Sequence, residues 1–252
     1  MKPPIDTPVD EHLARRLIAA QFPALQNATI RHIGEGWDNA AFLVEEHLVF
    51  RFPQRKICAP LMEKELANLP MLAPLLPYAI PVPTHVGKPD EGYPYPFAGY
   101  EILYGAPADT RTLNETEYRN LARDLGRFLR ALHNLDPAPF HAAGLPNDEI
   151  GKLDPKRLGV TETPLEGAPC VVHGDLYEKH LLLDHRNRLC GVIDWGDLHY
   201  GLPAVDLSAV HMVLPPNVHD EFFAMYGSVD DRSWRFAEYR ARYHQAMRAT
   251  AR

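Results

Sequence analysis

The chain has 252 residues, with 26 Lys and Arg against 33 Asp and Glu, a net charge of −7, and a hydrophobic share of 46%. This composition excludes a disordered chain, a collagen-like chain and a disulfide scaffold, and the length is sufficient for one large domain or two lobes. The acidic balance argues against nucleic-acid binding, because a phosphate backbone requires clustered Lys and Arg, and it fits either a cationic partner or a plain solubility charge.

The cysteines and the hydropathy pattern bear on the compartment. Cys58, Cys170 and Cys190 form no C-x-x-C pair, and an odd number of cysteines is typical of a reducing compartment. The N-terminus lacks the apolar run of a signal peptide, and no stretch approaches the ~18 apolar residues that a membrane span needs. We therefore expect a cytoplasmic protein without a membrane partner.

The first hundred residues predict a small, mostly antiparallel sheet with one helix laid on it. An amphipathic pattern before Pro23 predicts an N-terminal helix, and short runs rich in β-branched and aromatic residues predict a strand meander. Pro60 suits the first turn of a further helix. The expected elements are a helix over 10–22, strands within 28–52, a helix over 60–72 and a strand near 97–104.

The pattern becomes mostly helical after Gly105. Asn114 and Glu117 have the spacing of a capping box, followed by a clear apolar stripe. Two short apolar runs around a turn at 185–188 predict one embedded hairpin. The expected helices are 114–134, 203–214, 216–227 and 231–249, so the fold class is α+β.

Residues 171–197 carry the most informative chemistry. Asp175 and Asp194 each follow a short buried apolar run, so both carboxylates are expected at one edge of a sheet, and His180 comes five residues after Asp175. Such a set suits orientation of a hydroxyl nucleophile or the holding of Mg²⁺ on nucleotide phosphates. The spacing also matches the kinase catalytic loop H-R-D-x-x-x-x-N, with Asp194 in the place of the aspartate of D-F-G.

The segment HGDLYEKH…VIDWGD, with PAVDLS after it, resembles the signature of the aminoglycoside phosphotransferase family of small-molecule kinases. GEGWDNAAFLV and HLVFRFP are similar to the nucleotide loop and lysine-bearing strand of the branch with 2″-aminoglycoside and macrolide phosphotransferases. The resemblance implies a bilobal protein-kinase-like fold, with a nucleotide-binding lobe over 1–104 and a catalytic and substrate-binding lobe over 105–252.

The resemblance also implies roles for single residues. Asp175 takes the place of the catalytic aspartate that orients the acceptor hydroxyl, and Asp194 and His180 take the places of metal ligands. The remaining positions concern the nucleotide. Arg51 stands for the lysine on the α/β-phosphates, Glu65 (or Glu63) for its helix partner, Gly34 and Gly36 for the phosphate loop, and Glu101, Ile102 and Leu103 for the hinge that meets the base.

Three features depart from the family pattern. His180 replaces asparagine, and an imidazole prefers transition metals to Mg²⁺, although histidine occurs here in the macrolide-kinase-like branch. Arg51 replaces lysine, and its guanidinium is always charged and bulkier. The chain ends at Arg252 after one helix whereas family members usually run on, so we expect a shortened substrate-binding part or an incomplete product.

Structural interpretations stay open beside the functional ones. Asp175 and Asp194 could cap turns, His173 and His180 could be core histidines, and Asp206 is expected to tie the backbone of the catalytic loop. Others could be ordinary surface or turn residues, namely Arg51, Glu65, Gly34, Gly36 and Asp197. A zinc cluster of His173, His180 and His185 is disfavoured, because its spacing fits no zinc template.

The expected function is transfer of the γ-phosphate of ATP or GTP, with Mg²⁺, to a hydroxyl of an aminoglycoside or macrolide, as in antibiotic resistance. Acidic residues that could line a pocket for an amine-rich sugar are Asp197, Asp220, Glu221, Asp230 and Asp231. The alternatives are a metabolite kinase of the same fold and a nucleotide-binding pseudoenzyme, which the changes at His180 and Arg51 motivate.

Overall fold

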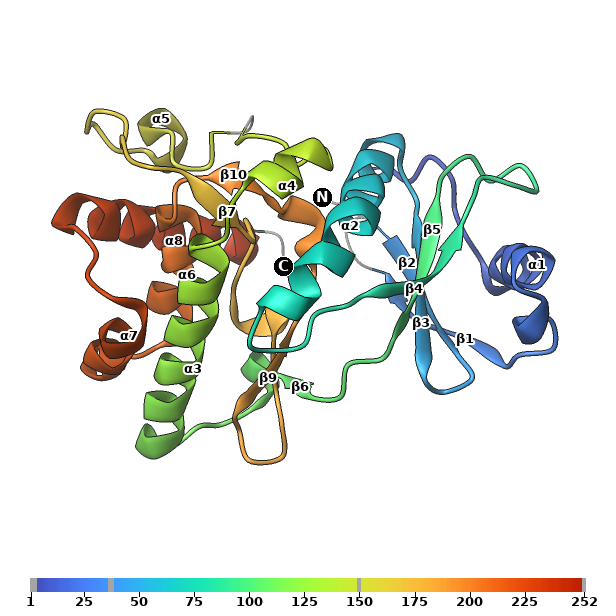
Figure 1. Ribbon diagram of the computed structural model, residues 1–252, viewed down its shortest axis with the longest axis horizontal. Coiled ribbons are helices and arrows are strands. Elements are labelled where there is room, and N and C mark those ends of the chain that lie inside the picture. Colours follow the sequence, from blue (N-terminus) through green and yellow to red (C-terminus); the bar gives the residue numbers. More distant parts are fainter. Residues whose placement is uncertain (1–3, 36–38, 149–150, 251–252) are drawn as a thin grey trace. The chain divides into compact units, whose positions relative to one another are not determined.

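The computed structural model describes residues 4–35, 39–148 and 151–250 and has an α+β structure (Figure 1). The chain divides into two compact units, one from the chain up to Ala73 with Pro81–Leu103 and the other from Pro74–Ile80 with Tyr104 onward. The short segment 74–80 groups with the second unit because Ala79 exchanges main-chain hydrogen bonds with Cys190 and Val192. The predicted α+β class is confirmed.

The first unit is built on a five-stranded antiparallel sheet in the order β1-β2-β3-β5-β4. Its strands are rich in β-branched and aromatic residues, and in β3 the even-numbered residues are buried on one face. The expected strand meander is therefore confirmed. The strands are β1 (Ile30–Glu35), β2 (Asn39–Val44), β3 (Leu48–Pro53), β4 (Pro83–Gly87) and β5 (Phe97–Glu101).

Two helices cover opposite faces of this sheet (Figure 1). Helix α1 (Glu11–Gln21) starts where Asp10 accepts a hydrogen bond from the main-chain N–H of Leu13, and its apolar face packs on the phenylalanines of β2, β3 and β5. Helix α2 (Ala59–Leu72) carries Pro60 in its first turn and packs Met62 against β5. The face of the sheet that α2 covers therefore carries the β3 and β5 side chains that point away from the aromatic core.

The second unit is mostly helical, as expected. Helix α3 (Glu115–His133) begins with the predicted capping box of Asn114 and Glu117. It packs on α7 so closely that a Cβ at Gly126 would lie 2.7 Å from the main-chain oxygen of Phe222. The other helices are α4 (Ala138–Ala142), α5 (Pro155–Leu158), α6 (Ala204–Val213), α7 (His219–Tyr226) and α8 (Asp231–Thr250).

Short strands in the second unit bring the catalytic segment together. The predicted hairpin consists of β8 (Leu181–Leu183) and β9 (Leu189–Val192), and β6 (Ala106–Pro107) pairs with β8. Strand β7 (Cys170–Val172) pairs with β10 (His199–Gly201), which the sequence pattern did not indicate. Short 3₁₀ turns are η1 (Pro23–Leu25), η2 (Lys56–Cys58), η3 (Ala73–Leu75), η4 (Ala108–Thr110), η5 (Glu178–His180), η6 (Trp195–Asp197) and η7 (Pro216–Val218).

Among the described residues, none of the helices combines the length and the apolar character that a membrane span needs.

Candidate active site

The loop that joins β7 to β8 is anchored by a buried carboxylate. Asp206, in the first turn of α6, accepts hydrogen bonds from the main-chain N–H groups of His173 (2.7 Å) and Gly174 (2.9 Å). Burial alone would raise the pKa of Asp206, but the hydrogen bond and charge of His133, the charge of His173 and the N–H of Gly174 lower it to about 2. Asp206 is therefore an ionised anchor for the backbone of the loop, the structural role expected from its position in the sequence.

Gly174 occupies a position that only glycine can fill. Its φ of +90° lies in the left-handed region, and a Cβ would lie 2.2 Å from the carbonyl oxygen of Asp197. Its own carbonyl oxygen accepts hydrogen bonds from Lys152 Nζ at 2.8 Å and Arg240 Nη2 at 2.7 Å. Lys152 also contacts Asp197 Oδ1 at 3.0 Å. Two nearly buried cations and one close backbone approach thus hold the peptide that precedes the candidate catalytic residue.

Asp175 follows Gly174, and its carboxylate faces α8. Its Oδ1 accepts a hydrogen bond from His244 Nε2 at 3.1 Å, and 29% of its side-chain surface is exposed. Burial would raise the pKa of Asp175, but the hydrogen bond from His244 and the charges of His180, His244 and Lys152 outweigh burial and lower it. The carboxylate is therefore ionised at neutral pH and can accept a hydrogen bond from a hydroxyl group.

His180 links this loop to Asp194. The turn η5 places the imidazole so that Nδ1 donates to the main-chain oxygen of Asp175 at 2.7 Å and Nε2 donates to Asp194 Oδ2 at 3.2 Å. Burial lowers the pKa of His180, but the hydrogen bond and charge of Asp194, with the acceptor groups of Asp175, raise it overall. Because both of its partners are acceptors, the ring is an imidazolium in this arrangement. One side chain thus contacts the two segments that carry the predicted carboxylates.

Asp194 itself has a left-handed backbone, with φ of +67°, at the point where β9 ends and η6 begins. Such a conformation is uncommon for a residue other than glycine and clusters at functional sites. The main chain before it is tied to the catalytic loop, because His173 Nε2 contacts the oxygen of Ile193 at 3.1 Å. The buried ring of Trp195 packs 4.6 Å from the ring of His173. The neighbours of Asp194 in the chain, Ile193 and Trp195, both contact His173, and these contacts hold Asp194 in its left-handed conformation.

The donors around Asp194 fit a Mg²⁺ ion that is shared with a nucleotide. In kinase-type sites Mg²⁺ is bound by one or two carboxylates, substrate phosphates and waters. Asp194 offers a carboxylate with 52% of its side chain exposed. Within the described ranges, no group of three or more His, Cys, Asp and Glu forms a complete protein cage. This donor set suits a cation whose remaining ligands come from phosphates and water.

In the first unit, the structure pairs Arg51 of β3 with Glu65 of α2. Arg51 Nη1 donates to Glu65 Oε2 at 2.8 Å, and the Glu65 side chain is only 2% exposed. The hydroxyl of Tyr100 donates to the same oxygen at 3.2 Å. Glu63, the alternative partner, is exposed. Of the two glutamates, the structure therefore selects Glu65 as the partner of the strand cation.

The other predicted nucleotide residues lie at the ends of strands. Gly34 sits where β1 has an irregular register against β2, and Gly36 lies outside the described residues. Glu101, Ile102 and Leu103 follow one another at the end of β5, where the N–H of Ile102 donates to the oxygen of His47 at 2.8 Å. Their roles toward a nucleotide stay predictions.

Three basic residues near the catalytic loop were missed by sequence reasoning. Lys152 lies in the proline- and glycine-rich connection, and Arg240 and His244 lie on α8. Neither region carries a recognisable motif. The only available signal was the recurrence of basic residues at every fourth position of the last helix, at 240, 244 and 248.

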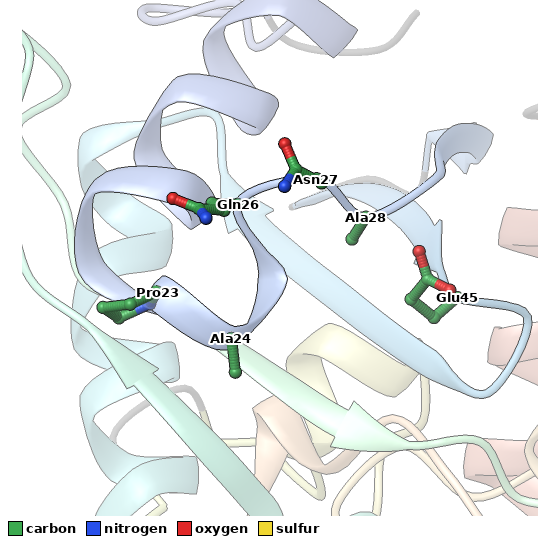
Figure 2. Close-up of a pocket in the computed structure, with 6 residues that line it drawn as sticks. All are labelled: Pro23, Ala24, Gln26, Asn27, Ala28 and Glu45. Carbon is green, nitrogen blue, oxygen red and sulfur yellow. The ribbon is translucent and has the colours of Figure 1, made fainter.

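The pocket in Figure 2 is separate from all of these residues. It is lined by the turn after α1 and the turn between β2 and β3, and its volume is about 310 Å³. The carboxylate of Glu45 in this pocket accepts hydrogen bonds from the N–H and the hydroxyl of Thr29. It holds none of the predicted catalytic, metal or nucleotide residues.

A comparison with family models decides the assignment. The model of the phosphotransferase enzyme family matches residues 29–159 and 147–243, which is most of the chain. The chain belongs to the phosphotransferase enzyme family. The prediction made from HGDLYEKH and VIDWGD is confirmed, and the protein is a phosphotransferase.

Solved structures agree with this assignment. The phosphotransferase is similar to APH(2″)-IIIa in its complex with GDP and kanamycin, with 26% identity, a TM-score of 0.79, and coverage of 94% of this chain and 90% of the other. It also has the fold of macrolide 2′-phosphotransferase MphH from Brachybacterium faecium, with 21% identity and a TM-score of 0.72. The match covers 97% of this chain and 93% of MphH.

A curated relative matches over a shorter part of the chain. The uncharacterised protein YcbJ of Bacillus subtilis (strain 168) is 24% identical over 168 residues, which are 54% of this chain and 55% of that protein. The match therefore spans about half the length of that relative.

Proposed function

We propose that the phosphotransferase is a small-molecule kinase that transfers the γ-phosphate of ATP or GTP to a hydroxyl group of an antibiotic-like acceptor, an aminoglycoside or a macrolide. Membership of the phosphotransferase family and similarity to a protein solved with GDP and kanamycin support this proposal. The observation that carries it is the ionised carboxylate of Asp175, held on an anchored loop and joined through His180 to Asp194.

Asp175 would act on the acceptor. An ionised carboxylate within hydrogen-bond reach of the acceptor hydroxyl orients the hydroxyl's lone pair toward the γ-phosphorus and takes the hydroxyl proton. The new P–O bond forms as the bond from the γ-phosphorus to the bridging oxygen breaks, and the nucleoside diphosphate leaves with that oxygen. The anchors described above keep the main chain of Asp175 in one conformation. Positioning of this kind supplies a large part of the rate of phosphoryl transfer, because the scheme has no covalent enzyme intermediate.

Asp194 would hold the metal, and His180 would hold Asp194. Mg²⁺, when bound, would supply neutralisation of charge on the nucleotide phosphates. The hydrogen bond from His180 fixes the orientation of the Asp194 carboxylate through Oδ2. In this arrangement His180 serves as a second support for the carboxylate, since both ring nitrogens already donate hydrogen bonds. We therefore assign His180 the role of orienting the metal ligand.

Arg51 would contact the α- and β-phosphates. Its guanidinium has several donors, so it can keep its bond to Glu65 and still donate to phosphate oxygens. Glu65 is nearly fully buried, and Tyr100 adds a second hydrogen bond to it, so the cation is held by a rigid partner.

Ion pairs within the chain bear on which acidic residues could meet a cationic acceptor. Of the acidic residues expected to receive an amine-rich sugar, Asp197 is paired with Lys152. Glu221 is bound by Arg119 and Arg123 at 2.8 and 2.6 Å. Because these two charges are already balanced, ammonium groups would gain less from them than from Asp220, Asp230 and Asp231, for which the acceptor role stays a prediction.

The test is a coupled assay of ATP and GTP consumption with kanamycin, a macrolide and hydroxylated metabolites as acceptors. We expect Mg²⁺-dependent turnover with an antibiotic, and Asp175→Asn should lower kcat by about three orders of magnitude while nucleotide binding is kept. Turnover only with a metabolite would identify a metabolite kinase instead. Tight binding of Mg-nucleotide with no turnover on any acceptor would identify a pseudoenzyme.

A further inference from the structure

Helix α8 carries three basic side chains at intervals of four residues, all of which contact the catalytic loop. Arg240 Nη2 donates to the oxygen of Gly174 at 2.7 Å, His244 Nε2 to Asp175 Oδ1 at 3.1 Å, and Arg248 Nη1 to Glu178 Oε1 at 2.6 Å. Residues four apart lie on the same face of a helix, one above the other. The order of the three bases along α8 therefore follows the order of their partners along the loop.

His244, the middle residue, has little freedom. Its ring lies 5.0 Å from the ring of Tyr177, which in turn has the guanidinium of Arg248 at 4.5 Å from its centroid. The side chain of His244 is 17% exposed. Nε2 must carry a proton because its partner is a carboxylate, and Nδ1 is buried with no hydrogen-bond partner among the described residues. The bond to Asp175 and the contact with Tyr177 therefore set the orientation of the ring.

The contact divides the two oxygens of Asp175. Oδ1 receives the hydrogen bond from His244, whereas no hydrogen bond to Oδ2 comes from the described part of the chain. The terminal torsion of an aspartate is broad and roughly two-fold, so a carboxylate without a fixed donor samples many orientations. A donor on one oxygen removes this freedom and leaves the second oxygen to face a substrate.

We propose that His244 is a positioning residue for phosphoryl transfer, whose Nε2–H fixes Oδ1 of Asp175 so that Oδ2 meets the acceptor hydroxyl. This inference rests on the proposed function. His244 acts through Asp175 and takes no proton from the acceptor, because its Nε2 is already a donor. The helix gives the histidine a rigid base, since Arg240, one turn earlier, also binds the oxygen of Val205 in α6.

The kinetic test compares two replacements of similar size. Gln places an amide N–H near the position of Nε2, whereas Leu fills the volume without a donor. We expect H244L to lower kcat about 10- to 100-fold, since loss of alignment has effects of that order, and H244Q to stay within about threefold of the parent. The KM for the nucleotide should change by less than about twofold in both. Arg242→Ala, at an exposed site of the same helix, is the control.

Equal kcat values for H244L and H244Q would overturn the inference, and so would a change confined to the nucleotide KM. A melting curve for each variant keeps a folding defect apart from a kinetic one. If H244L does not fold, H244Q alone tests the inference. A decrease in kcat of more than about 100-fold in a folded H244Q would contradict it, because the proposed role needs only one N–H donor.

A second readout does not depend on turnover. Nitrogen-15 spectra of the histidine rings should show the proton of His244 on Nε2 and a shift of that signal in Asp175→Asn. An unchanged His244 signal in that variant would overturn the inference even in an active enzyme. Conversely, a parent protein with no kinase activity and an intact His244–Asp175 signal would contradict only the proposed function.

Discussion

Asp206 offers a quantitative test of the anchored loop. The pKa of its fully buried carboxyl falls from 3.8 to about 2, and at ~1.4 kcal/mol per pH unit this difference corresponds to about 2.5 kcal/mol of folding free energy. Asn has nearly the shape of a protonated Asp but lacks its charge. It also offers only one acceptor oxygen to the N–H groups of His173 and Gly174. We therefore expect Asp206→Asn to lose about 2–3 kcal/mol at pH 7.

The pH dependence follows from the sign of the difference. The folded pKa of Asp206 lies below the unfolded one, so its stabilisation is fully present above about pH 4 and is lost as the pH falls through about 2. Urea unfolding, followed by the fluorescence of buried Trp195, should show a difference in the free energy of unfolding between parent and variant that becomes smaller below pH 4. Asp220→Asn, at an exposed site, is the control. A gap under about 0.5 kcal/mol at pH 7, or one that is constant with pH, would refute the reasoning.

Three further predictions concern close packing and the strand cation. Gly174→Ala should cost about 3 kcal/mol or more and abolish turnover, measured by urea unfolding and the coupled assay, because its Cβ would lie 2.2 Å from a main-chain oxygen at a left-handed φ. Gly126→Ala should lower the free energy of unfolding by about 2 kcal/mol in the same measurement, because its Cβ would lie 2.7 Å from a main-chain oxygen of α7. This clash outweighs the ~1 kcal/mol that alanine gains in helix propensity. A stabilised variant would contradict this prediction. Glu65→Gln should weaken Mg-ATP binding about tenfold in calorimetry through loss of the ion pair with Arg51, whereas Glu63→Gln should have no effect; equal affinities in the two variants would count against the assigned partner.

The parts that the sequence could predict are those whose signal is local. Alternating burial in β3, the capping box of α3 and the turn between β8 and β9 each depend on residues within one element. The same holds for the catalytic segment, where the spacing of Asp175, His180 and Asp194 is a property of one loop and one hairpin. These predictions needed no knowledge of the tertiary contacts.

The parts that could not be predicted depend on contacts over long distances in sequence. His244 meets Asp175 across 69 residues, and Lys152 meets Asp197 across 45. Apart from the four-residue spacing of the basic residues on α8, neither contact leaves a trace in periodicity or composition, and a basic residue on a helix face is usually solvated. The strand β10 was missed for a related reason, since three residues that end in Gly201 are too few for an alternating pattern.

The double contact on the carbonyl of Gly174 limits how this part of the loop can move. Lys152 and Arg240 both hold that oxygen, and the N–H of Asp175 in the same peptide faces His173 Nδ1 at 3.3 Å. A crankshaft rotation of this peptide would break three interactions at once and take one of the two hydrogen-bond acceptors from each of Lys152 and Arg240. Within the folded protein this peptide plane is therefore fixed, and local motion of Asp175 is confined to its side chain.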